Sequence, residues 1–257
     1  MSIHVVLSPH MDDAVLSCGG VMAAKVGQGE PVRVVNVFAG VPDYTHLSPY
    51  AERQHTKWGQ PADPVGMRRA EDRLALAPLG VAVDDWEWYD AIYREVDGRF
   101  LYTDHATTFG PVNPAESPLV AALAARLAAF RQADSGVIYY APLGVGGHVD
   151  HRLARDAALA LARQGAAVLF YEDFPYVARW GGLEEALAEV PVRWRPVWER
   201  IDVDAKIAAI ARYPSQLSAI FGDDDPPAVV RGYAESIAPD GQDTWERLWR
   251  IADGGND

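Results

Sequence analysis

The sequence predicts an α/β protein with a mainly parallel sheet, and three observations lead to this prediction. Short apolar, β-branched segments alternate with helix-like segments roughly five times along the chain, which is typical of a parallel sheet covered by helices on both faces. Polar clusters directly follow two of the predicted strands, where ligands bind in open α/β sheets. The 257 residues, 49% of them hydrophobic, are enough for one large core. We therefore expect a single Rossmann-like domain over residues 1–257, with a mostly helical part from about residue 202.

The predicted strands are short and rich in β-branched or aromatic residues. In order, they cover residues 3–7, 31–38, 83–89, 137–140, 167–171 and 193–201. Pro196 lies inside the last of them, and a proline that cannot donate to a neighbouring strand indicates an edge position.

The predicted helices have apolar residues at spacings of three and four. They cover residues 21–27, 67–79, 117–130 and 149–163, and most of the chain from Asp202 onward. Gly80 is a suitable residue to follow a helix end, and Ser117-Pro118 is a suitable helix start. Residues 41–66 and 95–116 are predicted to be long loops at the rim of the sheet.

One imidazole and two adjacent carboxylates follow the first predicted strand, in the run Ser8-Pro9-His10-Met11-Asp12-Asp13. Either Asp12 or Asp13 is a suitable N-cap for the following helix, and a simple cap is one interpretation of the run. A cap uses only one carboxylate, however. The other carboxylate and His10 would then be unexplained at the tip of a buried strand, where an unpaired charge is costly.

A second polar cluster follows the strand at 137–140, in the segment GVGGHVDHR at residues 144–152. Asp150 there is a suitable cap for the next helix. Because both clusters end predicted parallel strands, we expect them to converge on one edge of the sheet, at a topological switch point. His10, Asp13 and His151 then supply the two imidazoles and one carboxylate of a catalytic zinc site with a position left for water. Asp12 and His148 remain for proton transfer.

An acidic pair, Glu172-Asp173, follows the strand predicted at 167–171 and lies beside aromatic residues. The pair has two interpretations, a part of the substrate site or a turn with a capped end, and the sequence leaves both open.

The two motifs resemble those of the PIG-L/LmbE family of zinc-dependent N-deacetylases, which act on N-acetylglucosamine-type groups. The family pattern is a strand followed by PHPDD and a glycine pair, with a later HxDH. Here the pattern stands as Pro9-His10-Met11-Asp12-Asp13, Gly19-Gly20 and His148-Val149-Asp150-His151. Arg68-Arg69-Ala70-Glu71 followed by Leu79-Gly80 is similar to a further family segment. The chain departs from the pattern at three positions that are not predicted ligands, namely Met11, Ala14 and Val149.

The resemblance implies a hydrolase that removes an N-acyl group, with acetyl expected, from a small molecule containing an amino sugar. It implies that Arg68 helps to bind the sugar. In the mechanism that we expect, a divalent metal on His10, Asp13 and His151 activates water, and Asp12 is the general base. His148 would stabilise the oxyanion or protonate the leaving amine, and Asp150 would orient an imidazole. Zn²⁺ is the expected metal, with Fe²⁺ as an alternative that the ligand set also suits.

Composition and charge restrict the other partners. The 36 acidic residues outnumber the 23 basic ones for a net charge of -13, which argues against nucleic acid or an anionic membrane as a partner. No run approaches the roughly 18 apolar residues of a spanning helix, and no signal peptide is recognised, so a cytoplasmic location is expected. Cys18, the single cysteine, is predicted to be a small core residue. Homo-oligomerisation is compatible with the sequence.

Two other functional classes remain open from the residues alone. One is a metal-dependent phosphoesterase, although two-metal phosphatases need about twice the carboxylate ligands found here. The other is a non-catalytic binding protein that contains a metal, against which the presence of Asp12 and His148 argues.

Overall fold

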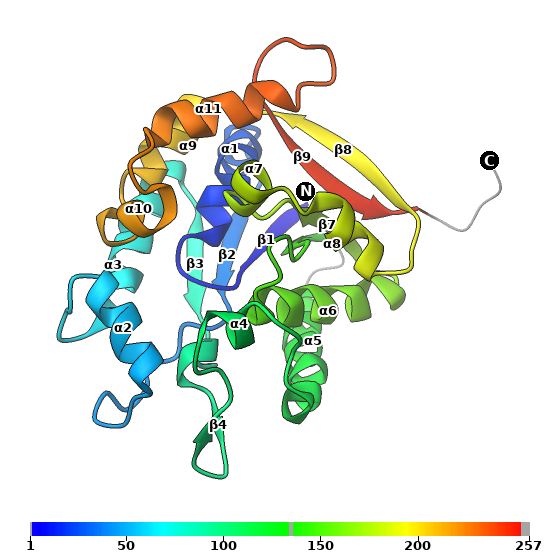
Figure 1. Cartoon of the computed structure of the whole chain (residues 1–257). Helices are drawn as coiled ribbons and strands as arrows, with labels where there is room; N and C mark the ends of the chain where they lie inside the picture. Colours follow the sequence, from blue (N-terminus) through cyan, green and yellow to red (C-terminus); the bar gives the residue numbers. More distant parts are fainter. Residues whose placement is uncertain (1, 134–135, 253–257) are drawn as a thin grey trace.

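The computed structural model describes residues 2–133 and 136–252 and contains a seven-stranded sheet with the order β3-β2-β1-β6-β7-β9-β8. The strands of this sheet are β1 (Ile3–Ser8), β2 (Val32–Asn36), β3 (Ala82–Asp85), β6 (Val137–Pro142), β7 (Ala167–Tyr171), β8 (Trp194–Arg200) and β9 (Trp245–Ile251). The strands from β3 to β7 pair in parallel, and β9 and β8 add antiparallel pairs at one side (Figure 1). The predicted α/β class and mainly parallel sheet are therefore confirmed.

Helices cover both faces of the sheet. Successive residues of each strand point to opposite faces, so apolar strand residues form one core on each side. Val6 of β1 packs in the core on the face covered by α1 (Asp13–Gly27), α9 (Val203–Ile210) and α11 (Pro226–Ser236). Val5 and Leu7 of the same strand pack in the other core, against α5 (Ser117–Ala133) and α6 (Val149–Arg163). Cys18 of α1 is fully buried, as predicted.

The remaining helices surround the edge of the sheet where β1 and β6 end (Figure 1). They are α2 (Pro49–Lys57), α3 (Pro64–Leu76), α4 (His105–Thr108), α7 (Tyr176–Trp180), α8 (Leu183–Glu189) and α10 (Pro214–Phe221). Three short 3₁₀ helices, Ala77–Leu79, Ala91–Tyr93 and Pro114–Glu116, and a hairpin of β4 (Glu95–Val96) and β5 (Arg99–Phe100) complete the structure.

The two predicted long loops contain regular structure. Residues 41–66 include α2, whose first turn is capped by Ser48, and residues 95–116 include the hairpin and α4. The following helix, α5, begins at Ser117 as predicted. Ser117 already has helical φ and ψ because it directly follows the 3₁₀ helix Pro114–Glu116, which Asn113 caps by accepting from the N–H of Ala115. Gly80 has the expected left-handed conformation, with φ 71°.

The prediction of a mostly helical C-terminal part is wrong for one segment, because residues 245–251 form the strand β9. Its sequence WERLWRI forms an antiparallel strand between β7 and β8. The prediction of an edge strand near Pro196 is confirmed, because β8 is the last strand of the sheet order. In the part of the chain that is described, no helix has both the length and the apolar character needed to cross a membrane.

Candidate metal centre and active site

The segment that follows β1 turns sharply into α1 and presents two carboxylates. Asp12 occupies the N-cap position, but among the described residues its carboxylate makes no capping hydrogen bond. Ser8 Oγ instead accepts from the backbone N–H of Ala14 at 2.9 Å, and Asp13 Oδ2 accepts from the N–H of His10 at 2.8 Å. The capping role expected of Asp12 or Asp13 is thus supplied by Ser8, which leaves the Asp12 carboxylate for other contacts.

The loop that follows β6 turns the second motif toward the first. All three glycines of the loop 144–147 have positive φ angles (87°, 87° and 79°), a conformation that favours glycine. The helix α6 then begins with His148 as its N-cap, whose Nδ1 accepts from the N–H of Asp150 at 3.1 Å. The prediction that Asp150 caps α6 is wrong, because its carboxylate points to His10 instead.

Three potential ligand atoms converge between the two motifs. Asp13 Oδ2 lies 3.2 Å from His10 Nδ1 and 3.3 Å from His151 Nε2. Ligands about 2.0 to 2.2 Å from a tetrahedral ion are separated by roughly 3.4 Å, so these distances suit one shared cation. His151 Nε2 is buried and has no hydrogen-bond partner among the described residues. An orphaned imidazole nitrogen that faces a carboxylate fits a metal ligand.

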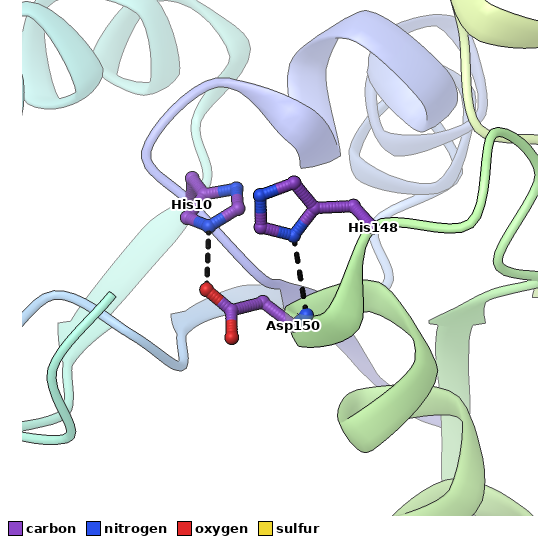
Figure 2. A group of neighbouring side chains, drawn as sticks. All are labelled: His10, His148 and Asp150. Carbon is purple, nitrogen blue, oxygen red and sulfur yellow. Dashed lines mark hydrogen bonds and ion pairs between the residues drawn. The ribbon is translucent and has the colours of Figure 1, made fainter. Parts of the chain in front are cut away.

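A second group of three side chains, His10, His148 and Asp150, also has closely spaced ligand atoms. Figure 2 shows that the nearby atoms of this group already interact with one another. His10 Nε2 lies 3.0 Å from Asp150 Oδ2, and His148 Nδ1 accepts the Asp150 backbone N–H. This group is therefore better suited to orienting side chains than to holding an ion.

A buried series of charged side chains contacts His10 at Nε2, the ring nitrogen that does not face Asp13. Asp150 is fully buried and is bonded to His10 through Oδ2 and to the Arg94 guanidinium through Oδ1. Arg94 is in turn paired with the buried carboxylate of Glu116, which accepts from the Tyr102 hydroxyl at 2.5 Å. Burial would raise the pKa of Asp150, but Arg94 and His10 hold that pKa well below its usual range. The negative charge on Asp150 fixes the ring so that His10 Nδ1 faces Asp13.

A second carboxylate holds the other imidazole. Asp173 Oδ1 lies 2.6 Å from His151 Nδ1, and Oδ2 accepts from the N–H groups of Gly144 and Val145 at 2.7 and 2.8 Å. Asp173 therefore bonds both His151 and the glycine-rich loop. Its two oxygens are occupied, so the predicted substrate contact of Asp173 is replaced by a positioning role.

The neighbouring Glu172 points away from the motifs. Its carboxylate accepts from the Tyr233 hydroxyl, Arg247 Nε and Trp249 Nε1, the last two at 2.5 and 2.7 Å. Glu172 is 4% exposed and is absent from the cleft described below, so the substrate contact predicted for it does not fit its position.

Burial and neighbouring charges separate the protonation states of the two adjacent aspartates. Burial would raise the pKa of Asp13, but His151 and His10 hold it well below its usual range. Burial raises the pKa of Asp12 to about 7, against the opposing effect of Arg68, whose Nη2 lies 3.3 Å from Asp12 Oδ1. These opposite shifts favour the ionised form of Asp13 and bring the pKa of Asp12 into the neutral range.

The surroundings of His148 favour its neutral form. Burial, followed by the charge of His10, holds the pKa of His148 well below its usual value. Since its Nδ1 accepts the Asp150 N–H, the neutral ring carries its proton on Nε2. The ring packs edge-on against His10, with centroids 4.8 Å apart, and against Phe109 at 5.0 Å. It is placed as a hydrogen-bond donor.

A cleft of about 330 Å³ opens above the three converging ligand atoms, a size within the range of ligand sites. It is lined by side chains from the first motif and from α2, α3, α4, α7 and α10: His10, Asp12, Asp13, Leu16, Tyr50, Gln54, Lys57, Arg68, His105, Phe109, Pro175, Tyr176, Trp180, Gln216, Ala219 and Ile220. Arg68 lines the cleft as expected for a substrate contact, and its buried Nε has no partner in the described chain.

The contact of Asp150 with His10 fits the orienting role expected for it, but sequence reasoning did not identify Asp173 as the partner of His151 or Arg94 as the partner of Asp150. Asp173 follows β7, the neighbour of β6 in the sheet, and a carboxylate at that strand end is a signal for a partner of a ligating histidine. The burial of Arg94, which is 9% exposed, could not be inferred from periodicity.

Comparisons with known proteins agree on one family. Residues 5–162 match the family model described as PIG-L, GlcNAc-PI de-N-acetylase. The chain is 31% identical over 268 residues to 2'-N-acetylparomamine deacetylase of Niallia circulans, with 95% of this chain and 92% of the relative covered.

Solved structures give the same result over nearly the whole length. The zinc-inhibited form of teicoplanin deacetylase Orf2 is 30% identical with a TM-score of 0.86, covering 99% of this chain and 100% of that chain. The A40926 pseudoaglycone deacetylase Dbv21 is 31% identical with a TM-score of 0.80, covering 100% and 99%. Both motifs lie within the matched residues, and the chain belongs to the PIG-L family of deacetylases.

Proposed function

We propose that the protein is a metal-dependent N-deacetylase that removes an N-acyl group, expected to be acetyl, from a small molecule containing an amino sugar. The observation that carries the proposal is the convergence of His10 Nδ1, Asp13 Oδ2 and His151 Nε2 below a cleft. Relatives named as deacetylases of N-acetylparomamine and teicoplanin support the same reaction on amino sugars.

His10, Asp13 and His151 would hold the cation, with Zn²⁺ as the proposed ion and Fe²⁺ as the alternative. When bound, a divalent cation lowers the pKa of water and polarises the acyl oxygen. One related structure is described as a zinc-inhibited form. Activity should therefore be measured both with one equivalent of zinc and with excess zinc, because excess zinc could inhibit the enzyme.

Asp12 is the proposed general base. Its pKa, raised by burial to about 7, suits a group that takes a proton from the attacking water at neutral pH. The water oxygen forms a bond to the acyl carbon, and the carbon–nitrogen bond then breaks. Asp12 passes its proton to the departing nitrogen, and the second water proton leaves the new carboxylic acid for solvent, so the products are a carboxylate and a free amine.

His148 is the proposed stabiliser of the oxyanion. Its Nε2–H is a donor, because the backbone of Asp150 occupies Nδ1 and burial keeps the ring neutral. A neutral donor favours hydrogen bonding to the developing negative charge over proton donation. The geometry thus supports one of the two roles expected for His148.

Arg68 is the proposed sugar contact. Its guanidinium lies between Asp12 and the ring of Trp58, whose centre is 4.9 Å away. These contacts fix the side chain at the edge of the cleft and leave donors for sugar hydroxyl groups.

The two alternative functions predict different products. The two groups of closely spaced ligand atoms in the described chain share His10, and in the second group His10 Nε2 is already bonded to Asp150, which supports one cation site over the two of a two-metal phosphatase. We would incubate the protein with N-acetylated amino sugars and with phosphate esters, after chelation and after reloading with Zn²⁺ or Fe²⁺. Acetate with equimolar amine supports the proposal, phosphate release supports a phosphoesterase, and metal binding without hydrolysis supports a binding protein.

A further inference from the structure

A row of aromatic rings forms one wall of the cleft. It starts at the imidazoles of the second motif, where Phe109 contacts His148 at 5.0 Å and Tyr176 contacts His151 at 5.9 Å between ring centroids. Phe109 and Tyr176 are 6.0 Å apart, and the row continues outward from Tyr176 to Trp180 at 5.5 Å. Trp180 is 67% exposed, so the row reaches from the buried ligands to the surface.

A second part of the cleft lining is mainly apolar and adjoins the aromatic row. It consists of Ala219 and Ile220 on α10, with Leu16 of α1 deeper in the cleft. Arg179, the residue before Trp180, donates to the backbone carbonyl of Ile220 and forms an ion pair with Asp224 at 2.8 Å. These contacts join α7 to α10 next to Trp180.

The charges that line the cleft do not suit a polycation. Among the described lining residues, the only carboxylates are Asp12 and Asp13, which are engaged with Arg68 and with the two imidazoles. Lys57 and Arg68 line the same cleft. Aromatic faces attract cations, but two cationic side chains oppose this attraction locally. The net charge of -13 acts at longer range and is screened beyond about 8 Å in physiological salt.

We propose that the cleft selects an acylated amino sugar joined to a neutral aromatic or apolar group, and that Trp180 stacks on that group. Ring faces prefer flat apolar partners, and an exposed tryptophan held at the end of an aromatic row provides such a face. A second ring with several ammonium groups would meet cations and find no available carboxylate. The inference rests on the proposed deacetylase function and names the substrate class for the same site.

The test compares three N-acetylated amino sugars: the phenyl glycoside and the methyl glycoside of N-acetylglucosamine with the same anomeric configuration, and 2'-N-acetylparomamine. The values of kcat/KM for amine release are measured with the wild type, Trp180→Ala and Trp180→Phe. We expect the wild type to prefer phenyl over methyl by about three- to tenfold, the usual size of a stacking contribution. The ratio should approach one in Trp180→Ala and recover in part in Trp180→Phe, and the paromamine derivative should be the poorest substrate.

Tyr89→Ala is the matched control, since Tyr89 is a 44% exposed aromatic residue outside the cleft, and its phenyl-to-methyl ratio should equal that of the wild type. An unchanged ratio in Trp180→Ala, or a preference for the paromamine derivative, would overturn the inference while leaving deacetylation intact. If no compound releases amine, the proposed function fails. The dissociation constants of the phenyl and methyl glycosides then give the same ratio by calorimetry and still decide the role of Trp180.

Discussion

The carboxylate of Asp150 lies 3.0 Å from Nε2 of His10, on the side of the ring opposite to Asp13. Two residues that are 140 positions apart in the sequence are therefore in direct contact at the meeting point of β1 and α6. Arg94 holds the same carboxylate from a third segment. The orientation of His10, one of the three proposed ligands, thus depends on three parts of the chain.

Replacement of Asp150 by Asn should weaken metal binding by about 10- to 100-fold, because a hydrogen-bonded partner fixes the orientation of a ligating imidazole. Competition with a chromogenic chelator measures the affinity. Asp84→Asn, which breaks a surface ion pair with Arg33, is the control and should bind metal like the wild type. A loss of stability in Asp150→Asn without any loss of affinity would mean that Asp150 only stabilises the fold.

The two adjacent aspartates should separate into two phenotypes. Asp13→Asn should lose the metal, because Asp13 Oδ2 is the atom shared by both imidazoles. Asp12→Asn should keep the metal and lose turnover by about 10²- to 10⁴-fold, the usual contribution of a general base. Metal analysis and acetate release on the same preparations compare the two variants. The opposite pattern would exchange the proposed roles.

His148 should behave as a neutral donor. His148→Phe should lower kcat by about 10²- to 10³-fold, and His148→Gln should retain part of the activity through its amide N–H. Since burial holds the pKa of His148 below its usual value, the ring does not gain or lose its charge above about pH 6.5. The fall of kcat at alkaline pH, if there is one, should therefore be the same in the wild type and in His148→Gln. A fall that is present in the wild type and absent in His148→Gln would identify His148 as the general acid.

Asp72 should make the stability of the fold depend on pH. Burial raises the pKa of Asp72 to about 6, although Asn36 and Tyr213 donate hydrogen bonds to its carboxylate. The folded-state pKa lies above the unfolded value of about 3.9. The stability contributed by protonated Asp72 is therefore fully present below about pH 4 and is lost as the pH rises through about 6. The loss is on the order of 3 kcal/mol.

The contribution of Asp72 to the pH dependence is the difference in free energy of unfolding between the wild type and Asp72→Asn at each pH. The free energy of unfolding by urea is measured for the wild type and Asp72→Asn between pH 4 and pH 7. The variant cannot ionise at this position, so its stability relative to the wild type should rise across this range. Parallel curves for the two proteins would show that Asp72 does not titrate there.

Gly20 should not tolerate alanine, although alanine favours helices. A Cβ atom at Gly20 would lie 2.5 Å from Cβ of Ile201, so Gly20→Ala should destabilise the fold by about 1 to 3 kcal/mol. In α11, nothing lies within 4 Å of a Cβ atom at Gly232, and Gly232→Ala should stabilise by about 0.5 to 1 kcal/mol. Urea unfolding measures both. If the two variants changed the free energy of unfolding equally, the side chain of Ile201 would be able to move away from the added Cβ atom at Gly20.

The sequence indicated the edge of the sheet that carries the site because the two motifs end parallel strands. β1 and β6 are neighbours in the sheet, and their ends bring His10 and His151 together. This inference needed only the direction of the strands and the positions of the motifs.

Other features depend on tertiary contacts that local patterns do not contain. In β9, charged residues alternate irregularly with aromatic ones, and only its place between β7 and β8 makes it a strand. The helix α2 has three buried residues among many polar ones and was predicted as loop. The partner of Asp173 could not be identified from its position alone, because the choice between a sugar and His151 depends on where α6 packs.

The position of β9 in the sheet has a consequence for synthesis on the ribosome. When the nascent chain has emerged as far as β8, every proposed metal ligand is present, but the strand that joins β8 to β7 is still missing. Glu246 on β9 also accepts the N–H groups of Gly20 and Val21 and pairs with Lys206 at 2.8 Å, which ties the first helix to the last strand. The helix α1 therefore gains these contacts only after Glu246, 226 positions beyond Gly20, has been synthesised, so this part of the fold depends on contacts of high sequence separation.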